Sequence, residues 1–192
     1  MDGIIKQYSN VWGDDPTSLI EDYRYQLQLT AKLDALIPKD FDQETLLEIV
    51  LWKLNRFPRV EPALLEELKV VADFKPKTHR QAEELLGKLL ASPGIRLPMA
   101  STILRFLNPE VFQIIDDRAY RMLRPSEPLY PSKPANGNNL AGYLKNSIRI
   151  YFEYLDAMHA IVSDRLPFHL ADRILYQLDI KLGNKIGDRE ES

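Results

Sequence analysis

A Pro-Gly turn that precedes a helix is the first pattern in this sequence that could do chemistry. The turn Ser92-Pro93-Gly94-Ile95-Arg96 carries a glycine that permits positive φ and a close backbone approach. The segment 97–107 should be a helix, whose first backbone N–H groups lack partners within the helix. Because those donors and the helix dipole favour negative charge, the pattern indicates either a phosphate site or an ordinary turn between two helices.

Two adjacent aspartates form the second pattern. Asp116 and Asp117 follow an apolar segment, and the basic residues Arg118 and Arg121 come shortly after them. An aspartate at such a point is a candidate chemical group, but it is also a good N-cap for a following helix. Both interpretations stay open from the residue types alone.

Helices must position both patterns, because apolar residues recur at helical spacing along most of the chain. No alternation of period two persists beyond a few residues, so the expected fold class is all-α with about eight to nine helices. The segment 45–55 is apolar on most faces and is expected to be central and buried. The main expected helices cover residues 17–36, 45–55, 63–74, 80–90, 97–107, 140–165 and 167–182.

The organisation expected from these elements is one helical domain over residues 1–183, with two helical lobes as the alternative. The two helices that flank the Pro-Gly turn occupy about residues 80–108. A loop rich in Pro, Ser, Gly and Asn covers 125–139, and residues 184–192 should form a polar tail.

Composition limits the class of protein. The chain has 192 residues, is 45% hydrophobic and contains no cysteine, which excludes disulfides, thiolate catalysis and iron–sulfur ligation. No apolar run approaches the roughly 18 residues of a membrane span, and no secretory signal pattern begins the sequence. We therefore expect a cytoplasmic, monomeric protein without membrane association.

The two patterns together resemble the helix-hairpin-helix (HhH-GPD) DNA glycosylase superfamily, which includes endonuclease III and the adenine and 3-methyladenine glycosylases. The family hairpin L-P-G-V-G has its counterpart in Ser92-Pro93-Gly94-Ile95-Arg96, with the small residue Ala100 behind it. The family segment V-D-x-H or P-D-x has its counterpart in Ile115-Asp116-Asp117-Arg118, with Arg121 near the next turn. The match covers about residues 89–123, a sixth of the chain.

The resemblance implies a DNA glycosylase of base excision repair, which flips a base out of double-stranded DNA and hydrolyses its N-glycosidic bond. By position, Asp116 would be the catalytic carboxylate, and Asp117 is the alternative because a shift of one residue exchanges them. The hairpin amides around Gly94, Ile95 and Arg96 would hold a backbone phosphate.

Departures from the family pattern narrow the expected activity. Pro98 stands where bifunctional members carry the Schiff-base lysine, so a monofunctional enzyme without lyase activity is expected. Arg96 replaces the second hairpin glycine, and its guanidinium could add a phosphate contact. No cofactor is expected, with a monovalent cation at the hairpin backbone as the one candidate, and no iron–sulfur cluster can form without cysteine.

A basic and aromatic stretch at residues 52–59 adds further candidates. By resemblance, the end of this helix faces the DNA cleft, which makes Lys53, Asn55 and Arg56 DNA-binding candidates together with Arg118 and Arg121. Residues 92–150 carry eight Lys or Arg against four Asp or Glu, a local charge of +4 in a chain of net charge −3. The alternatives to an enzyme are a catalytically inactive DNA-binding module and a protein-interaction module in which the hairpin is only a turn.

Overall fold

The computed structural model describes residues 9–13, 15–23, 25–54, 58–134 and 138–185. Over these ranges the chain is helical, which confirms the predicted all-α class. The described residues contain one isolated β-bridge. In it, Ser163 and Leu166 exchange two backbone hydrogen bonds of 3.0 Å.

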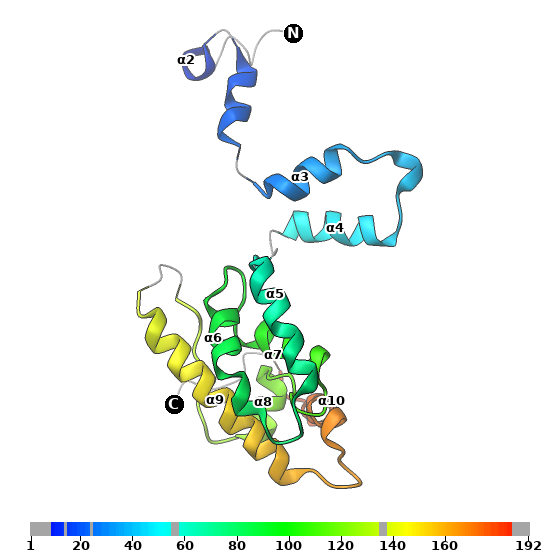
Figure 1. The fold of residues 1–192 in the computed structure, drawn as a ribbon, viewed down its shortest axis with the longest axis vertical. Helices are drawn as coiled ribbons and strands as arrows, with labels where there is room; N and C mark the ends of the chain where they lie inside the picture. The colour runs from blue at the N-terminus through cyan, green and yellow to red at the C-terminus, as the bar shows by residue number, and fades with distance from the viewer. Residues whose placement is uncertain (1–8, 14, 24, 55–57, 135–137, 186–192) are drawn as a thin grey trace. The chain divides into compact units, whose positions relative to one another are not determined.

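The chain divides into two compact units, residues 1–57 and 58–192, within the region treated above as one domain or two lobes (Figure 1). Described helices of the first unit are α2 (Ser9–Trp12), a 3-10 helix (Pro16–Asp22), α3 (Leu27–Asp34), a 3-10 helix (Pro38–Asp40) and α4 (Gln43–Leu54). Those of the second are α5 (Pro62–Leu68), 3-10 helices (Lys69–Asp73 and His79–Ala82), α6 (Glu83–Ala91), α7 (Leu97–Leu107), α8 (Asp117–Leu123), α9 (Leu140–Ile161) and α10 (Phe168–Lys181).

The expected helix over residues 17–36 is interrupted. Its first part is a 3-10 helix that ends at Asp22, and α3 begins only after Gln26, whose φ of 45° is left-handed. Tyr25 in the break donates its hydroxyl hydrogen bond to the carbonyl of Trp52 at 2.5 Å and packs edge-on against the Trp52 ring. A tertiary contact to α4 therefore overrides the local helical periodicity.

The expectation that α4 is a buried central helix is wrong. None of its residues is buried, and its leucines and valine face solvent, with Leu47 54% and Leu54 58% exposed. Within its unit α4 packs mainly against α3, and one neighbour cannot cover a helix that is apolar on most faces.

The second unit contains the main hydrophobic core. Helix α6 buries Leu85, Leu86, Leu89 and Leu90, whose spacing of three to four residues places them on one face. Along α6 runs the 22-residue helix α9, and α10 packs chiefly against α8 (Figure 1). Helix α7 has the predicted limits, and its Ala100 and Ser101 are fully buried.

Asn108 ends α7 and directs the chain toward the aspartates. Its side-chain amide donates to the carbonyls of Val71 at 2.9 Å and Phe74 at 3.1 Å, while its backbone N–H donates to Leu104. Pro109 then prevents helical continuation because it fixes φ and lacks an N–H group. The residues that follow extend across the interior to the start of α8.

Candidate functional site

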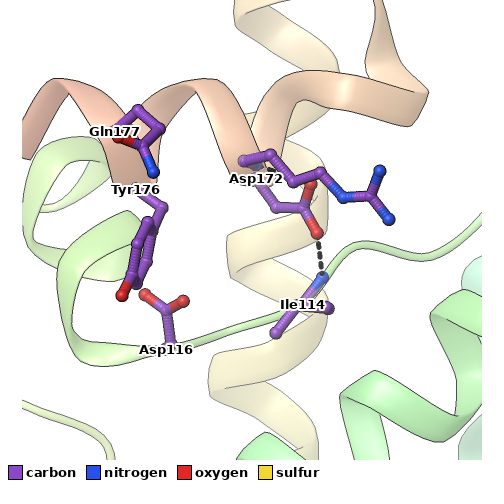
Figure 2. Close-up of a pocket in the computed structure, with 6 residues that line it drawn as sticks. Ile114, Asp116, Asp172, Tyr176 and Gln177 are labelled. Carbon is purple, nitrogen blue, oxygen red and sulfur yellow. Dashed lines mark hydrogen bonds between the residues drawn. The ribbon is translucent and has the colours of Figure 1, made fainter.

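Side chains from three helices hold the extended segment Gln113–Asp116, which leads into α8. From α7, the Ser101 hydroxyl accepts the N–H of Ile115 at 3.1 Å. From α10, the Asp172 carboxylate accepts the N–H of Ile114 at 3.1 Å (Figure 2). This segment is too irregular to satisfy its own backbone groups, so buried side chains supply the partners.

Two tyrosines of α9 complete this clamp from the carbonyl side. The Tyr151 hydroxyl donates to the carbonyl of Gln113 at 2.9 Å, and the Tyr154 hydroxyl donates to that of Ile114 at 2.8 Å. Burial raises the pKa of both phenols well above the usual value, so both remain protonated donors. We call Ser101, Tyr151, Tyr154 and Asp172 the segment clamp.

Asp116 is the residue that this clamp presents. It is the N-cap of α8, and its Oδ1 accepts the N–H of Ala119 at 2.7 Å. The N-cap interpretation of the sequence is therefore confirmed. The same carboxyl is half-buried and lines two neighbouring hollows, so capping and a chemical role are compatible.

The first hollow lies between the segment and α10. It has a volume of about 330 Å³ and is lined by Ile114, Asp116, Asp172, Arg173, Tyr176 and Gln177. In Figure 2 the ring of Tyr176 stands over Asp116, with its hydroxyl end directed toward the carboxyl group. The volume falls at the lower end of small-molecule pockets, roughly 300–1,000 Å³.

The environment disfavours the charged form of Asp116. Partial burial is the main cause of its raised pKa, and the nearby carboxylates of Asp117 and Asp172 add to the effect. Hydrogen bonds from the backbone N–H groups of Ala119 and Arg118 oppose it but do not cancel it. A carboxyl with a raised pKa at the wall of a hollow is a candidate acid–base group.

Asp117, the alternative carboxylate, has a different environment. Its Oδ1 accepts the Tyr130 hydroxyl at 2.7 Å, and of the two hollows it lines the second, of about 210 Å³. Asp116 and Tyr176 border both hollows. The geometry thus separates the two aspartates that the sequence left interchangeable.

Two of the arginines predicted to bind DNA, Arg118 and Arg121, are engaged within the protein. Arg118 donates to Asp179 at 2.7 Å, and Arg121 donates to the same carboxylate through Nε at 2.9 Å and a terminal nitrogen at 2.8 Å. Asn184 also donates to Asp179 at 2.8 Å. These bonds lower the pKa of Asp179 to about 2, and Arg118 also stacks over Tyr176.

The three hairpin residues predicted to hold a phosphate differ from one another in burial and in backbone conformation. Gly94 is exposed with φ of 80°, a positive value of the kind that glycine permits. Ile95 is fully buried, and its backbone N–H donates to the Ser92 carbonyl at 3.3 Å. Arg96 is exposed, adopts an ordinary extended conformation at φ −114°, and is the N-cap residue of α7.

The third predicted group lies in the other unit. Lys53 is exposed in the last turn of α4. Asn55 and Arg56 lie outside the described residues. The DNA-binding role of all three residues remains a prediction.

Most basic side chains behind the local charge of +4 have internal partners. Besides Arg118 and Arg121, the set includes Arg105 beside Asp172, Arg124 on Glu127 and Arg149 on Glu153. Over the described ranges, Arg96, Lys133 and Lys145 have no carboxylate within ion-pair distance. The charge count from sequence therefore overstates the charge that faces outward.

The sequence patterns did not predict that the segment clamp and Tyr176 belong to the candidate site. One pattern on α10 could have indicated part of it. Asp172 and Asp179 share a helix face with the apolar Leu175, and charged residues on such a face are expected to have buried partners. The helical spacing of Tyr151 and Tyr154 with apolar residues of α9 predicts packing, but no sequence pattern predicts which carbonyls their hydroxyls reach.

No group of three or more His, Cys, Asp or Glu suited to a metal ion occurs among the residues that the structure describes. In the same ranges, no helix is both long and apolar enough to cross a membrane. Comparisons with protein-family models, with curated proteins and with solved structures find no match to this chain. The candidate site is described by its geometry: a half-buried aspartate at the N-terminus of α8, presented by a segment that side chains of α7, α9 and α10 hold in place.

Proposed function

We propose that this chain is a helix-hairpin-helix protein that binds double-stranded DNA and hydrolyses the N-glycosidic bond of a flipped base, with Asp116 as the catalytic carboxylate. The observation that carries the proposal is the segment clamp, which fixes Asp116 at the wall of a hollow where its pKa is raised.

The proposed chemistry needs only one carboxylate and water. As the bond between the sugar C1′ and the base nitrogen breaks, positive charge develops on the sugar, and an ionised Asp116 beside it would stabilise that charge. The departing base takes up a proton from solvent, and water then adds to C1′ and releases its proton to Asp116 or to solvent, so that the net reaction is hydrolysis. Tyr176, which stands over Asp116 in Figure 2, offers an aromatic face to an extruded base.

Asp116 and Asp117 provide a matched pair for the test. The substrates are duplexes that each carry one damaged or mismatched base, and the readout is single-turnover base release. We expect Asp116→Asn to reduce the rate about 100-fold or more, since it removes the charge that stabilises the transition state. Asp117→Asn should change the rate only a few-fold, because Asp117 bonds Tyr130 instead.

The pH dependence follows from the direction of the Asp116 shift. Only the carboxylate form can stabilise a cationic sugar, so the rate should rise with pH through a pKa above the usual aspartate value. Equal losses in the two variants, or a rate that falls over this range, would contradict the assignment to Asp116.

A second candidate, a DNA-binding module without catalysis, is favoured by one observation. The Asp116 carboxyl already has a structural partner, because its Oδ1 caps α8 by accepting the N–H of Ala119. Binding to duplexes with an abasic-site analogue and to intact duplexes, measured at about 50 and about 200 mM salt, separates the candidates. Preference for the abasic duplex without base release from any substrate supports the binding module, while no binding to either duplex contradicts both functions.

A further inference from the structure

The ammonium group of Lys133 lies among three backbone carbonyls where α6 ends and the hairpin begins. Its Nζ donates to the carbonyl oxygens of Leu90 at 2.6 Å, Ser92 at 2.7 Å and Ile95 at 3.2 Å. Lys133 belongs to the loop before α9, more than thirty-five residues away along the chain from each acceptor. The loop is thereby tied to the hairpin through one side chain.

These carbonyls form a natural cation site. The last carbonyls of a helix lack partners within it and carry the negative end of the helix dipole, and Leu90 lies in the last turn of α6. Gly94, with φ of 80°, reverses the chain so that carbonyls on both sides of the tip reach one ammonium. An ammonium group has three N–H donors, so three carbonyls satisfy it completely.

A monovalent metal ion at the hairpin would need the same oxygens. Potassium binds by exchanging its hydration shell for backbone carbonyls, and an ammonium group is similar to it in size and charge. Since Lys133 already occupies the oxygens of Leu90, Ser92 and Ile95, the hairpin does not fit the metal ion considered from sequence.

We propose that Lys133 is a built-in cation of the hairpin, which makes the hairpin independent of monovalent metal ions, and that its removal uncovers a site for potassium or ammonium. Partial burial and the neighbouring Arg96 guanidinium lower the pKa of Lys133, consistent with an amine enclosed by protein. The proposal concerns the hairpin alone and holds whether or not the chain acts on DNA.

The test uses the full chain and three variants. Lys133→Ala empties the site, Lys133→Met removes the charge but retains a side chain that fills the space, and Lys145→Ala removes an exposed lysine of α9 as the control. Thermal unfolding is followed in potassium chloride, ammonium chloride and choline chloride at equal ionic strength. Choline is too large to enter a site of this size.

The expected result is a cation effect confined to one variant. The wild type and Lys145→Ala should unfold at the same temperature in all three salts. Both Lys133 variants should unfold about 5 °C lower in choline chloride, since three carbonyls each lose a hydrogen bond from the ammonium group. Potassium and ammonium should restore several degrees to Lys133→Ala and none to Lys133→Met.

Two outcomes would overturn the proposal: a wild type stabilised by potassium over choline, or a Lys133→Ala variant as stable as wild type in choline. If neither Lys133 variant folds, acetic anhydride labelling of the wild type decides. Lys133 should be labelled at least tenfold more slowly than Lys145 in the native state and equally fast in urea. Equal native labelling would refute an enclosed ammonium.

Discussion

At the scale of single residues, the surroundings of two aspartates in the second unit shift their pKa values in opposite directions. Asp179 accepts hydrogen bonds from Arg118, Arg121 and Asn184, and its pKa falls from 3.8 to about 2. Asp116 is partly buried, and its pKa is raised. The negative charge on Asp179 therefore stabilises the folded state, whereas the negative charge on Asp116 destabilises it.

This contrast predicts opposite effects of the same substitution at neutral pH. Asp179→Asn should lower the free energy of unfolding by about 2 kcal/mol, because a shift of one pKa unit corresponds to about 1.4 kcal/mol. Asp116→Asn should unfold at the same or a higher temperature, because Asn caps helices as well as Asp and removes a poorly solvated charge.

Urea titrations across the acid range check the sign. Because the folded pKa of Asp179 lies below its ordinary value, its contribution is complete above pH 4 and is lost as pH falls toward about 2. The wild type should therefore lose stability over that interval relative to Asp179→Asn. Glu66→Gln, in the exposed pair with Lys69, is the control and should change stability by less than about 0.5 kcal/mol. A stable Asp179→Asn at neutral pH would show that the pair with the arginines contributes little.

At the scale of elements, α7, α9 and α10 cooperate to fix a segment that has no regular structure. Ile115 is fully buried, so its N–H must find a partner within the protein, and Ser101 of α7 is that partner. The clamp explains why a serine is buried in α7 next to the apolar residues Ala100 and Leu104.

Ser101 and its neighbour Thr102 allow a matched test of the clamp. Both hydroxyls donate to the Pro98 carbonyl at 2.8 Å, but only Ser101 also accepts from Ile115. Ser101→Ala should therefore destabilise the protein by about 1–3 kcal/mol more than Thr102→Val, because a buried N–H is left unpaired. Chemical denaturation measures the difference, and equal losses in both variants would show that the bond to Ile115 is replaceable.

At the scale of the whole molecule, the two units differ in how well their apolar residues are covered. The buried core cluster is drawn from residues 64–175 and lies wholly within the second unit. Helix α4 of the first unit contains no buried residue. The second unit thus has the core that independent folding requires.

A fragment of residues 58–192 should accordingly fold by itself. We expect helical circular dichroism and a single cooperative thermal transition, as the cluster of α5 to α10 remains intact. The fragment retains the hairpin and Asp116 but lacks Lys53, Asn55 and Arg56, so a loss of DNA affinity relative to the full chain would support their predicted role. A fragment without a cooperative transition would contradict an independent core.

The sequence by itself determined the helical class and the limits of α7, and it allowed for a positive φ at Gly94 and for an N-cap at the paired aspartates. These features depend on nearby residues: periodicity, a turn glycine, a capping carboxylate and the Asn-Pro stop. The candidate site could be predicted only in part for the same reason, since the aspartates were visible but not their environments.

Only the tertiary structure decided which aspartate borders both hollows, which cations are already paired and which cation lies at the hairpin carbonyls. Asp179 meets Arg118 from sixty-one positions away, and Lys133 meets Ser92 from forty-one. Burial of α4 was predicted wrongly because an apolar helix becomes buried only if other elements cover it. Such contacts depend on how helices pack in three dimensions, and local spacing in the sequence does not encode which partners meet.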